Sequence, residues 1–324
     1  MKKFLIIQTA YIGDVILSTP VIEKLHSFYP EAQIDFLVRK GNQNLLESHP
    51  YITNLLTWNK KQGKQKNLIR LIKLIRDKKY DTVINLQRFT STGLMTIFSG
   101  SKDKIGFNKN PLSFLFTYKV QHEIGNGKHE VERNIELISH LTDNSLVLPK
   151  LYPSELDYKN VSHYKEGPYI CIAPNSVWFT KQYPKNKWIE LINSIDSKYQ
   201  IYLIGGVEDK ILCDEIVEES EHKKVQNLCA KHSLIETSAL IADATMNYSN
   251  DSAPMHMASA MNAPTMAIFC STIPKFGFGP LSDNSKSIET KEDLDCRPCG
   301  LHGYRKCPKG HFKCSNITID QLKF

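Results

Sequence analysis

The chain alternates short apolar runs with amphipathic segments, and this alternation strongly limits the folds open to it. The runs over residues 4–8, 34–38 and 82–86 have the length and composition of buried strands. The segments over residues 15–28, 68–76 and 129–141 have the periodicity of helices. A strand–helix alternation of this kind predicts a parallel, doubly wound sheet with helices on both faces.

The same alternation restarts in the second half of the chain. We predict strands over residues 169–173, 200–204 and 265–269, with helices over 188–195 and up to 219. Residues 148–167 lie between the two halves, are rich in Pro, Tyr and charge, and have no clear period, so we interpret them as a linker. The chain has 324 residues, enough for two domains. We therefore predict two α/β domains, 1–155 and 156–324, with ligands at the carboxyl ends of their strands.

Composition narrows the class of protein. Hydrophobic residues make up 41% and charged residues 23% of the chain, as in soluble globular proteins. Lys and Arg outnumber Asp and Glu by 41 to 34, which gives a formal charge of +7. This excess favours acidic partners such as phosphates, nucleic acid or an anionic membrane surface, without choosing among them. The first apolar run stops at Gln8, too early for a signal peptide, and we predict a cytoplasmic protein.

Residues 250–256 indicate a phosphate site. They are typical of the end of a strand, a tight polar turn and the start of a helix, with Ser252 suited to the N-cap and Pro254 to the first turn. Backbone N–H groups and the helix dipole at such a start stabilise an anionic phosphate, and His256 would lie beside them. The same residues also suit an ordinary capped helix with a packed histidine.

Other candidate residues also follow predicted strands. Gly13 would let the backbone turn sharply, and Asp14 is either a general base or the cap of a helix. Lys181 lies in a loop and suits a phosphate as a compact charge, or it is a solvated lysine. Glu208 follows a glycine pair and either accepts hydrogen bonds from ribose hydroxyls or begins its helix.

Five short motifs carry a family resemblance in the order in which they occur. Residues 12–16 (IGDVI), 104–107 (KIGF), 129–134 (HEVERN), 181–184 (KQYP) and 251–256 (DSAPMH) resemble the ADP-heptose:lipopolysaccharide heptosyltransferases of glycosyltransferase family 9. The resemblance implies a GT-B fold, with two Rossmann-like domains facing a central cleft. It also implies that the first domain binds the acceptor and the second binds the nucleotide sugar.

The resemblance implies residue roles as well. Asp14 matches the catalytic base, which would deprotonate an acceptor hydroxyl so that its oxygen attacks the anomeric carbon with inversion. Lys181 matches the lysine that neutralises the departing diphosphate. The expected donor-binding residues are Ser176, Glu208, Asp251, Ser252, Ala253 and His256, although the family usually has glycine where Ala253 stands. For the acceptor we expect Gly13 together with the basic residues Lys60, Lys61 and Lys64, which are otherwise an ordinary solvated charge run.

The expected partners follow from the same resemblance. They are an ADP-sugar donor and a lipid-anchored glycan acceptor, so we expect a peripheral position at the cytoplasmic face of the inner membrane. We expect no nucleic acid partner, and no metal or cofactor in catalysis, because Lys181 and a helix terminus would supply the positive charge.

Four of the eight cysteines cluster near the end of the chain. Cys296 and Cys299 have the spacing of a zinc knuckle, and Cys307 and Cys314 follow closely. Four thiolates of this kind predict a structural zinc ion in tetrahedral geometry. Reduced thiols, or disulfides in an oxidising compartment, are the alternatives.

The leading hypothesis is an inverting transferase that moves heptose from ADP-heptose to the lipopolysaccharide inner core. Three alternatives stay open at this point. The first is a member of the same family that uses another nucleotide sugar or another glycan. The second is a nucleotide-sugar 2-epimerase with the same two-domain fold. The third is a basic module that binds nucleic acid. The donor sugar, the acceptor hydroxyl and the oligomeric state are likewise left open by the sequence.

Overall fold

The structure is a computed structural model that describes residues 1–324, and it divides into two units, Met1–Tyr152 and Pro153–Phe324. The sequence placed this boundary at 155/156. Residues 148–167, which we interpreted as a linker with no clear period, contain one helix, α6 (Glu155–Val161). Ser154 begins this helix: its hydroxyl accepts the Asp157 N–H at 3.3 Å, and the Asp157 carboxylate accepts the Ser154 N–H at 2.7 Å.

The first unit contains a six-stranded sheet in which every strand pair is parallel. The strand order is β3-β2-β1-β4-β5-β6. The strands are β1 (Lys3–Ile7), β2 (Gln33–Arg39), β3 (Asn54–Trp58), β4 (Thr82–Asn85), β5 (Asp103–Phe107) and β6 (Tyr118–Val120). Ile7 at the end of β1 pairs with Leu37 of β2 and Asn85 of β4, so these strands end at one edge.

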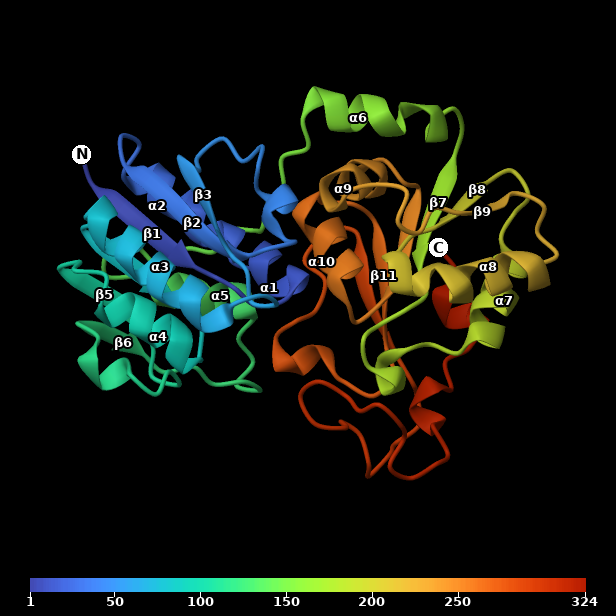
Figure 1. The fold of residues 1–324 in the computed structure, drawn as a ribbon. Coiled ribbons are helices and arrows are strands. Elements are labelled where there is room, and N and C mark those ends of the chain that lie inside the picture. Colours follow the sequence, from blue (N-terminus) through green and yellow to red (C-terminus); the bar gives the residue numbers. More distant parts are fainter. The chain divides into compact units, whose positions relative to one another are not determined.

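Helices cover both faces of this sheet (Figure 1). They are α1 (Ile12–Ile16), α2 (Thr19–Phe28), α3 (Lys64–Lys78), α4 (Thr90–Ile97) and α5 (Glu130–Glu136). Helices α2 and α5 pack together, and so do α3 and α4. Apolar side chains of the central strands pack with Leu71, Ile75 and Met95 beneath α3 and α4. The single helix expected over 15–28 is split after Ile16, and the helix expected to run to residue 141 ends at Glu136.

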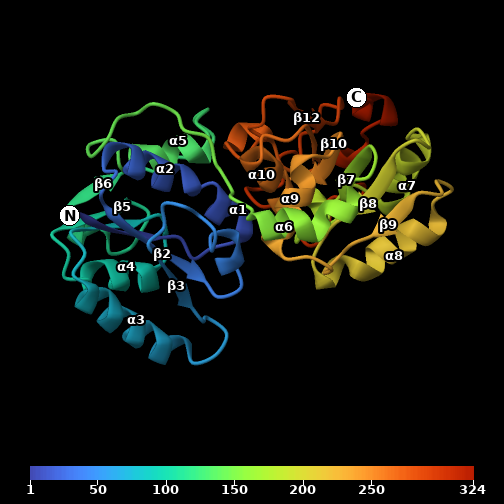
Figure 2. The ribbon, with the colours of Figure 1, turned by 90° about the horizontal axis from the view of Figure 1, so that it is seen from above.

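The second unit contains another six-stranded parallel sheet, with the order β12-β11-β10-β7-β8-β9. Its strands are β7 (Tyr169–Ala173), β8 (Gln200–Leu203), β9 (Val225–Asn227), β10 (Met246–Asn250), β11 (Thr265–Phe269) and β12 (Ser285–Glu289). The helices beside α6 are α7 (Lys185–Ser194), α8 (Lys210–Glu219), α9 (Leu234–Ala242) and α10 (Ala253–Ala260). Figure 2 shows α7 beside α8, and α6 beside α9.

The last residues of the chain are part of the second core. Ile317 and Leu322 are buried in the same apolar cluster as Trp188 of α7. The Tyr183 hydroxyl donates to the Ile317 carbonyl at 2.8 Å, and the Tyr248 hydroxyl donates to the Leu322 carbonyl at 2.7 Å. No helix in either unit has the length and apolar character that crossing a membrane requires.

Both sheets follow one strand order. Counted from the first strand of each unit, that order is 3-2-1-4-5-6, the order of dinucleotide-binding sheets. In the first unit the strands up to β3 lie on one side of β1 and the strands from β4 on lie on its other side, so the strand order reverses between β1 and β4. In the second unit it reverses in the same way between β7 and β10. Ligands of such folds bind outside the carboxyl ends of the strands at these reversal points. The loops after β1, β4, β7 and β10 are therefore where a site is expected.

Candidate active site

Asp14 lies just beyond the carboxyl end of β1, in the short helix α1. One carboxylate oxygen accepts the Tyr11 N–H at 3.1 Å, so the side chain does serve as a cap. The residue nevertheless keeps part of its surface exposed at this edge of the sheet. Gly13 also lies inside α1, and it is absent from the glycines with positive φ. The sharp turn expected at Gly13 is therefore not found.

The carboxyl of Asp14 holds its proton more strongly than an ordinary aspartate. Burial is the main cause and the negative charge of Glu130 adds to it, and together they raise the pKa of Asp14 to about 6. The Tyr11 N–H and the charge of Arg88 act in the opposite direction. A pKa near 6 leaves the group ionised at neutral pH and more basic than usual, which suits a general base.

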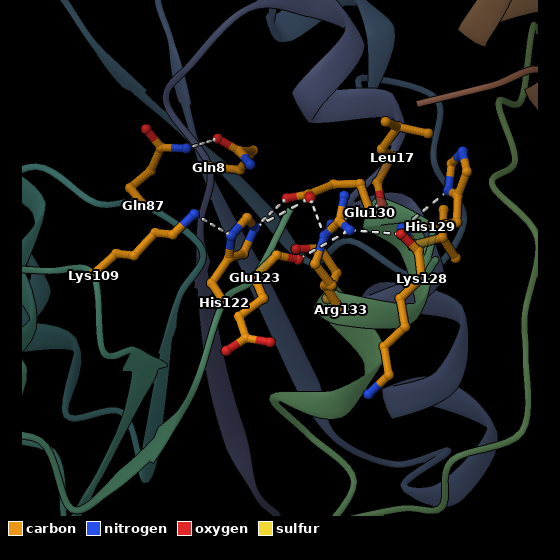
Figure 3. Close-up of polar contacts among 12 residues, drawn as sticks. Gln8, Leu17, Gln87, Lys109, His122, Glu123, Lys128, His129, Glu130 and Arg133 are labelled. Atoms are coloured by element: carbon orange, nitrogen blue, oxygen red, sulfur yellow. Dashed lines mark hydrogen bonds and ion pairs between the residues drawn. The ribbon is translucent and has the colours of Figure 1, made fainter. Parts of the chain in front are cut away.

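Glu130, whose charge acts on Asp14, belongs to a network of charged side chains (Figure 3). The His122 Nε2 lies 3.1 Å from both Glu130 oxygens, and the Arg133 Nε donates to Glu130 Oε2 at 2.8 Å. The Lys109 Nζ lies 2.7 Å from His122 Nδ1. Burial opposes ionisation of Glu130, but His122 and Arg133 hold the pKa of Glu130 below its usual value. Glu130 therefore stays charged and continues to act on Asp14.

Arg133 anchors this network in the fold. Its side chain is 1% exposed, and its guanidinium donates to the Glu123 carbonyl at 3.2 Å and the Lys128 carbonyl at 2.6 Å. It thereby fixes the loop that leads into α5. Of this network, sequence reasoning recognised a motif at 129–134 but assigned no role to Glu130. It noted Lys109 only as part of a basic–apolar region that could face the acceptor, and it missed His122. Their positions depend on contacts between β5, β6 and α5 that no short pattern records.

One of the three predicted acceptor lysines reaches the edge of the first sheet. The Lys60 ammonium donates to the Thr9 carbonyl, in the loop after β1, at 2.6 Å, and lies 4.7 Å from the Trp58 ring centroid. Burial, together with the charges of Arg39 and Lys64, lowers the pKa of Lys60 to about 8. Lys61 and Lys64 are exposed to solvent instead.

In the second unit, Lys181 and Asp251 meet at the carboxyl edge of the sheet. The Lys181 Nζ lies 2.7 Å from Asp251 Oδ2, and the Thr272 hydroxyl donates to the same oxygen at 2.6 Å. The side chains of Lys181 and Asp251 are 14% and 10% exposed, so both are fixed but reachable. The loops beyond β7, β10 and β11 each contribute one of these three residues. Thr272 was missed by sequence reasoning.

Asn250, at the end of β10, holds the loop after β7 at two points. Its side-chain amide donates to the Pro174 carbonyl at 2.8 Å, and its oxygen accepts the Tyr183 N–H at 2.9 Å. The residue is fully buried. One amide thus holds both Pro174 and Tyr183 in the loop that carries Lys181, a role that its place in the motif did not reveal.

The start of α10 is built differently from the expectation. Ser252 occupies the N-cap position, but its side chain makes no capping hydrogen bond, and its hydroxyl donates to the Asn250 carbonyl at 3.3 Å. Ala253 and Pro254 form the first turn, and His256 is buried behind them. The N-terminus of α10 therefore carries no side-chain acceptor, and it follows directly after Asp251.

The remaining donor candidates differ in how they are held. The Ser176 N–H donates to the Asn175 side chain at 2.8 Å, and the Ser176 carbonyl accepts from Gln182 at 2.6 Å, which fixes the loop after β7. Glu208 is exposed in the short helix after β8. Its neighbour Asp209 fixes this loop instead, because its carboxylate accepts the Gly206 N–H at 2.7 Å and also accepts a hydrogen bond from the Asn175 side chain.

All eight cysteines are unpaired, so the structure contains no disulfide. The Cys296 sulfur lies 3.9 Å from His311 Nε2. Burial, followed by the neighbouring cysteines, raises the pKa of the Cys299 thiol. No group of three or more His, Cys, Asp or Glu side chains is arranged to hold a metal ion. The predicted zinc site at Cys296, Cys299, Cys307 and Cys314 is therefore not confirmed.

The chain is similar to known proteins over most of its length. Residues 68–303 match the model of "Glycosyltransferase family 9 (heptosyltransferase)". "Lipopolysaccharide heptosyltransferase 3" of Escherichia coli K12 is 31% identical over 320 residues, covering 88% of this chain and 89% of that protein.

Two solved Escherichia coli structures have the same fold. The ADP-heptose lipopolysaccharide heptosyltransferase II has a TM-score of 0.82 at 23% identity, covering 99% of this chain and 96% of that one. A heptosyltransferase solved with ADP has a TM-score of 0.72 at 20% identity, covering 88% of this chain and 92% of that one. These likenesses confirm the predicted fold class of two Rossmann-like units.

Proposed function

The chain belongs to glycosyltransferase family 9, and on that premise we propose that it transfers heptose from ADP-heptose to a sugar of the lipopolysaccharide inner core. The relative that is 31% identical carries the name of a lipopolysaccharide heptosyltransferase and matches nearly end to end, which supports this substrate class. The observation that carries the chemistry is the placement of Asp14, a carboxylate with a pKa of about 6 at the reversal point of the first sheet.

Asp14 would act as the general base. Its carboxylate accepts the proton of an acceptor hydroxyl while that oxygen forms a bond to the anomeric carbon of heptose. The bond from the anomeric carbon to the diphosphate breaks on the opposite face, so the configuration inverts and ADP leaves with the electron pair. A base whose pKa lies close to neutral pH is matched to this step.

The edge of the second sheet would hold the diphosphate. An ammonium has three N–H donors, and the Lys181 group uses one of them on Asp251. The others, with the N-terminus of α10, would stabilise the negative charge that develops on the leaving group. Asp251 would position Lys181 without touching the phosphates, because two anions repel each other. Ser176, Ser252 and Ala253 would line the donor, with His256 behind them. This set invokes no divalent metal.

The first unit would bind the acceptor. Arg88 acts on Asp14 through its charge, and Lys60 bonds the loop after β1; both would attract the acidic groups of an inner-core glycan. Lys61 and Lys64, both exposed, would extend this positive surface. A lipid-anchored acceptor would bring the enzyme to the cytoplasmic face of the inner membrane, where anionic lipids attract basic surfaces. Transfer would require the edges of both sheets to share one cleft, as in the GT-B fold.

The test is the release of ADP from ADP-heptose, with and without a purified deep-core acceptor. We expect acceptor-dependent release by the wild type and a loss of about 100-fold or more in Asp14→Ala, the range of a general base. Asp14→Asn is the matched variant, since its amide oxygen can still accept the Tyr11 N–H. We expect Asn to be as inactive as Ala while it keeps the wild-type melting temperature.

Three other results would overturn parts of the proposal. Full activity in Asp14→Asn would mean that Asp14 is only a helix cap. Turnover of ADP-heptose without any acceptor would favour an epimerase. Turnover of another nucleotide sugar in place of ADP-heptose would keep the catalytic residues and reject the proposed donor.

A further inference from the structure

The cysteine loop, residues 296–314, docks onto the loop that carries Lys181. The Thr180 N–H donates to the Tyr304 carbonyl at 3.1 Å, and the Tyr304 N–H donates to the Thr180 hydroxyl at 2.7 Å. The buried Ser271 hydroxyl also donates to the Thr180 hydroxyl, at 3.0 Å. Thr180 is 1% exposed and directly precedes Lys181, so the backbone of Lys181 is fixed by a segment more than a hundred residues away.

Gly303 lies closest to Lys181 in this contact. Its φ is +76°, a conformation that residues with a side chain rarely adopt. A Cβ on Gly303 would lie 2.9 Å from the Thr180 hydroxyl oxygen, 3.1 Å from Lys181 Cγ and 3.1 Å from the Ser271 hydroxyl oxygen. The stem of Lys181 thus packs on the bare backbone of the loop, and any side chain there would push it away.

The same loop also fixes the partner of the Lys181 ammonium. The Arg297 guanidinium donates to the carbonyls of Phe269 at 3.0 Å, Cys270 at 2.7 Å and Thr272 at 2.7 Å. Three hydrogen bonds to carbonyls within residues 269–272 hold the segment after β11 in place. The hydroxyl of Thr272 in that segment bonds the oxygen of Asp251 that pairs with Lys181.

We propose that Gly303 is a positioning residue for Lys181. In this proposal the cysteine loop holds the aliphatic part of the Lys181 side chain, and its counter-ion Asp251, in the positions that binding of a diphosphate requires. The inference rests on the proposed role of Lys181 in donor binding. It gives the cysteine loop a function that needs no metal. Gly303 touches no substrate and acts through Lys181 alone.

The experiment compares Gly303→Ala with Gly310→Ala in the full chain, with ADP as the probe. Gly310 has a φ of +74° but nothing within 4 Å of its would-be Cβ, so it matches the backbone strain without the contact. We expect calorimetry to give an ADP dissociation constant about tenfold higher for Gly303→Ala. For Gly310→Ala we expect a change of less than about twofold. Equal effects of the two variants would overturn the proposal.

A double-mutant cycle separates positioning from general damage. Lys181→Met keeps the stem and removes the charge. If Gly303 acts through Lys181, Gly303→Ala has little further effect on ADP affinity in the Lys181→Met protein. An undiminished effect there would overturn the inference. Loss of affinity in Lys181→Met but not in Gly303→Ala would overturn the inference and leave the proposed function intact. Unchanged affinity in Lys181→Met would overturn the donor role of Lys181 itself.

A second pair of variants tests the same contact without adding an atom, in case Gly303→Ala does not fold. Thr180→Val removes the hydroxyl that bonds Tyr304 and Ser271, whereas Thr180→Ser keeps it. We expect weaker ADP binding in Thr180→Val and recovery in Thr180→Ser. Equal affinity in both would show that the docked loop does not position Lys181.

Discussion

At the level of single residues, the charge of Glu130 acts on the proton affinity of Asp14. The base works only when it is ionised, so the rate should rise with pH through a midpoint of about 6, the pKa of Asp14. Glu130→Gln removes a negative charge that raises this pKa, so the midpoint should move to lower pH. The measurement is the pH dependence of kcat/KM, which reports groups of the free enzyme.

Glu132→Gln is the matched control for this shift. Glu132 lies in the same turn of α5, but its side chain is exposed, where solvent and salt screen its charge. Glutamine there can still accept the His129 N–H that Glu132 accepts at 2.5 Å. We expect kcat/KM of this variant to rise with pH through the same midpoint as that of the wild type. An unmoved or higher midpoint in Glu130→Gln would contradict the assignment of Asp14 as the titrating base.

Sequence reasoning reached some site residues and missed others for a physical reason. Asp14, Lys181 and Asp251 all lie in the segments that run from the end of a strand to the first turn of the next α-helix, so their place at the edge of a sheet could be predicted from the order of elements alone. Thr272 and Gly303 owe their roles to partners that are distant in sequence. The sequence around a glycine in a polar loop does not indicate whether another loop packs on that glycine.

At the level of elements, β10 carries a matched pair of buried amides at its two ends. Asn250 donates to the Pro174 carbonyl and accepts from Tyr183 at the carboxyl end. Asn247 donates to the Ile241 and Pro264 carbonyls near the amino end. Alanine at either position removes two buried side-chain hydrogen bonds, so each variant should lose about 1–3 kcal/mol of unfolding free energy.

The two variants should differ in ligand binding. Asn250→Ala frees the loops beside Lys181, so we expect its ADP affinity to fall about tenfold or more. Asn247→Ala acts at the opposite end of the strand and should keep wild-type affinity despite a similar loss of stability. Chemical denaturation and ADP titration of both proteins check this. Equal affinities would mean that the Asn250 bridge does not shape the donor site.

Four of the five strands that sequence reasoning missed lie at the edge of a sheet. All four edge strands, β3, β6, β9 and β12, were absent from the predicted pattern, and so was β5. Edge strands are covered on fewer sides, so their composition is mixed and their apolar signal is weak. The central strand β7 is buried along its whole length and was predicted with its observed bounds. Burial, which produces the apolar pattern, therefore decided which strands could be read from the sequence.

At the level of the whole molecule, the two units repeat one strand order, yet their edges carry different chemistry. The edge of the first sheet has a carboxyl with a raised pKa beside a network of charges. The edge of the second sheet has a lysine held by an aspartate at the start of a helix. A base and an anion site are the two parts that an inverting transfer from a nucleotide sugar requires. Under the proposed function, the shared scaffold accounts for where each part lies, and the loop residues account for its role.

Because the proposed donor residues all belong to the second unit, residues 153–324 should bind ADP without the first unit. This fragment has its own sheet and its own apolar core, which includes the last residues of the chain. We expect it to unfold cooperatively and to bind ADP within about threefold of the affinity of the full chain, since few donor contacts are removed. Residues 1–152 should bind no ADP. Lys181→Met in the fragment should weaken binding as much as it does in the full chain. A folded fragment that does not bind ADP would mean that the first unit supplies an essential part of the donor site. The assignment of donor binding to the second unit alone would then be wrong.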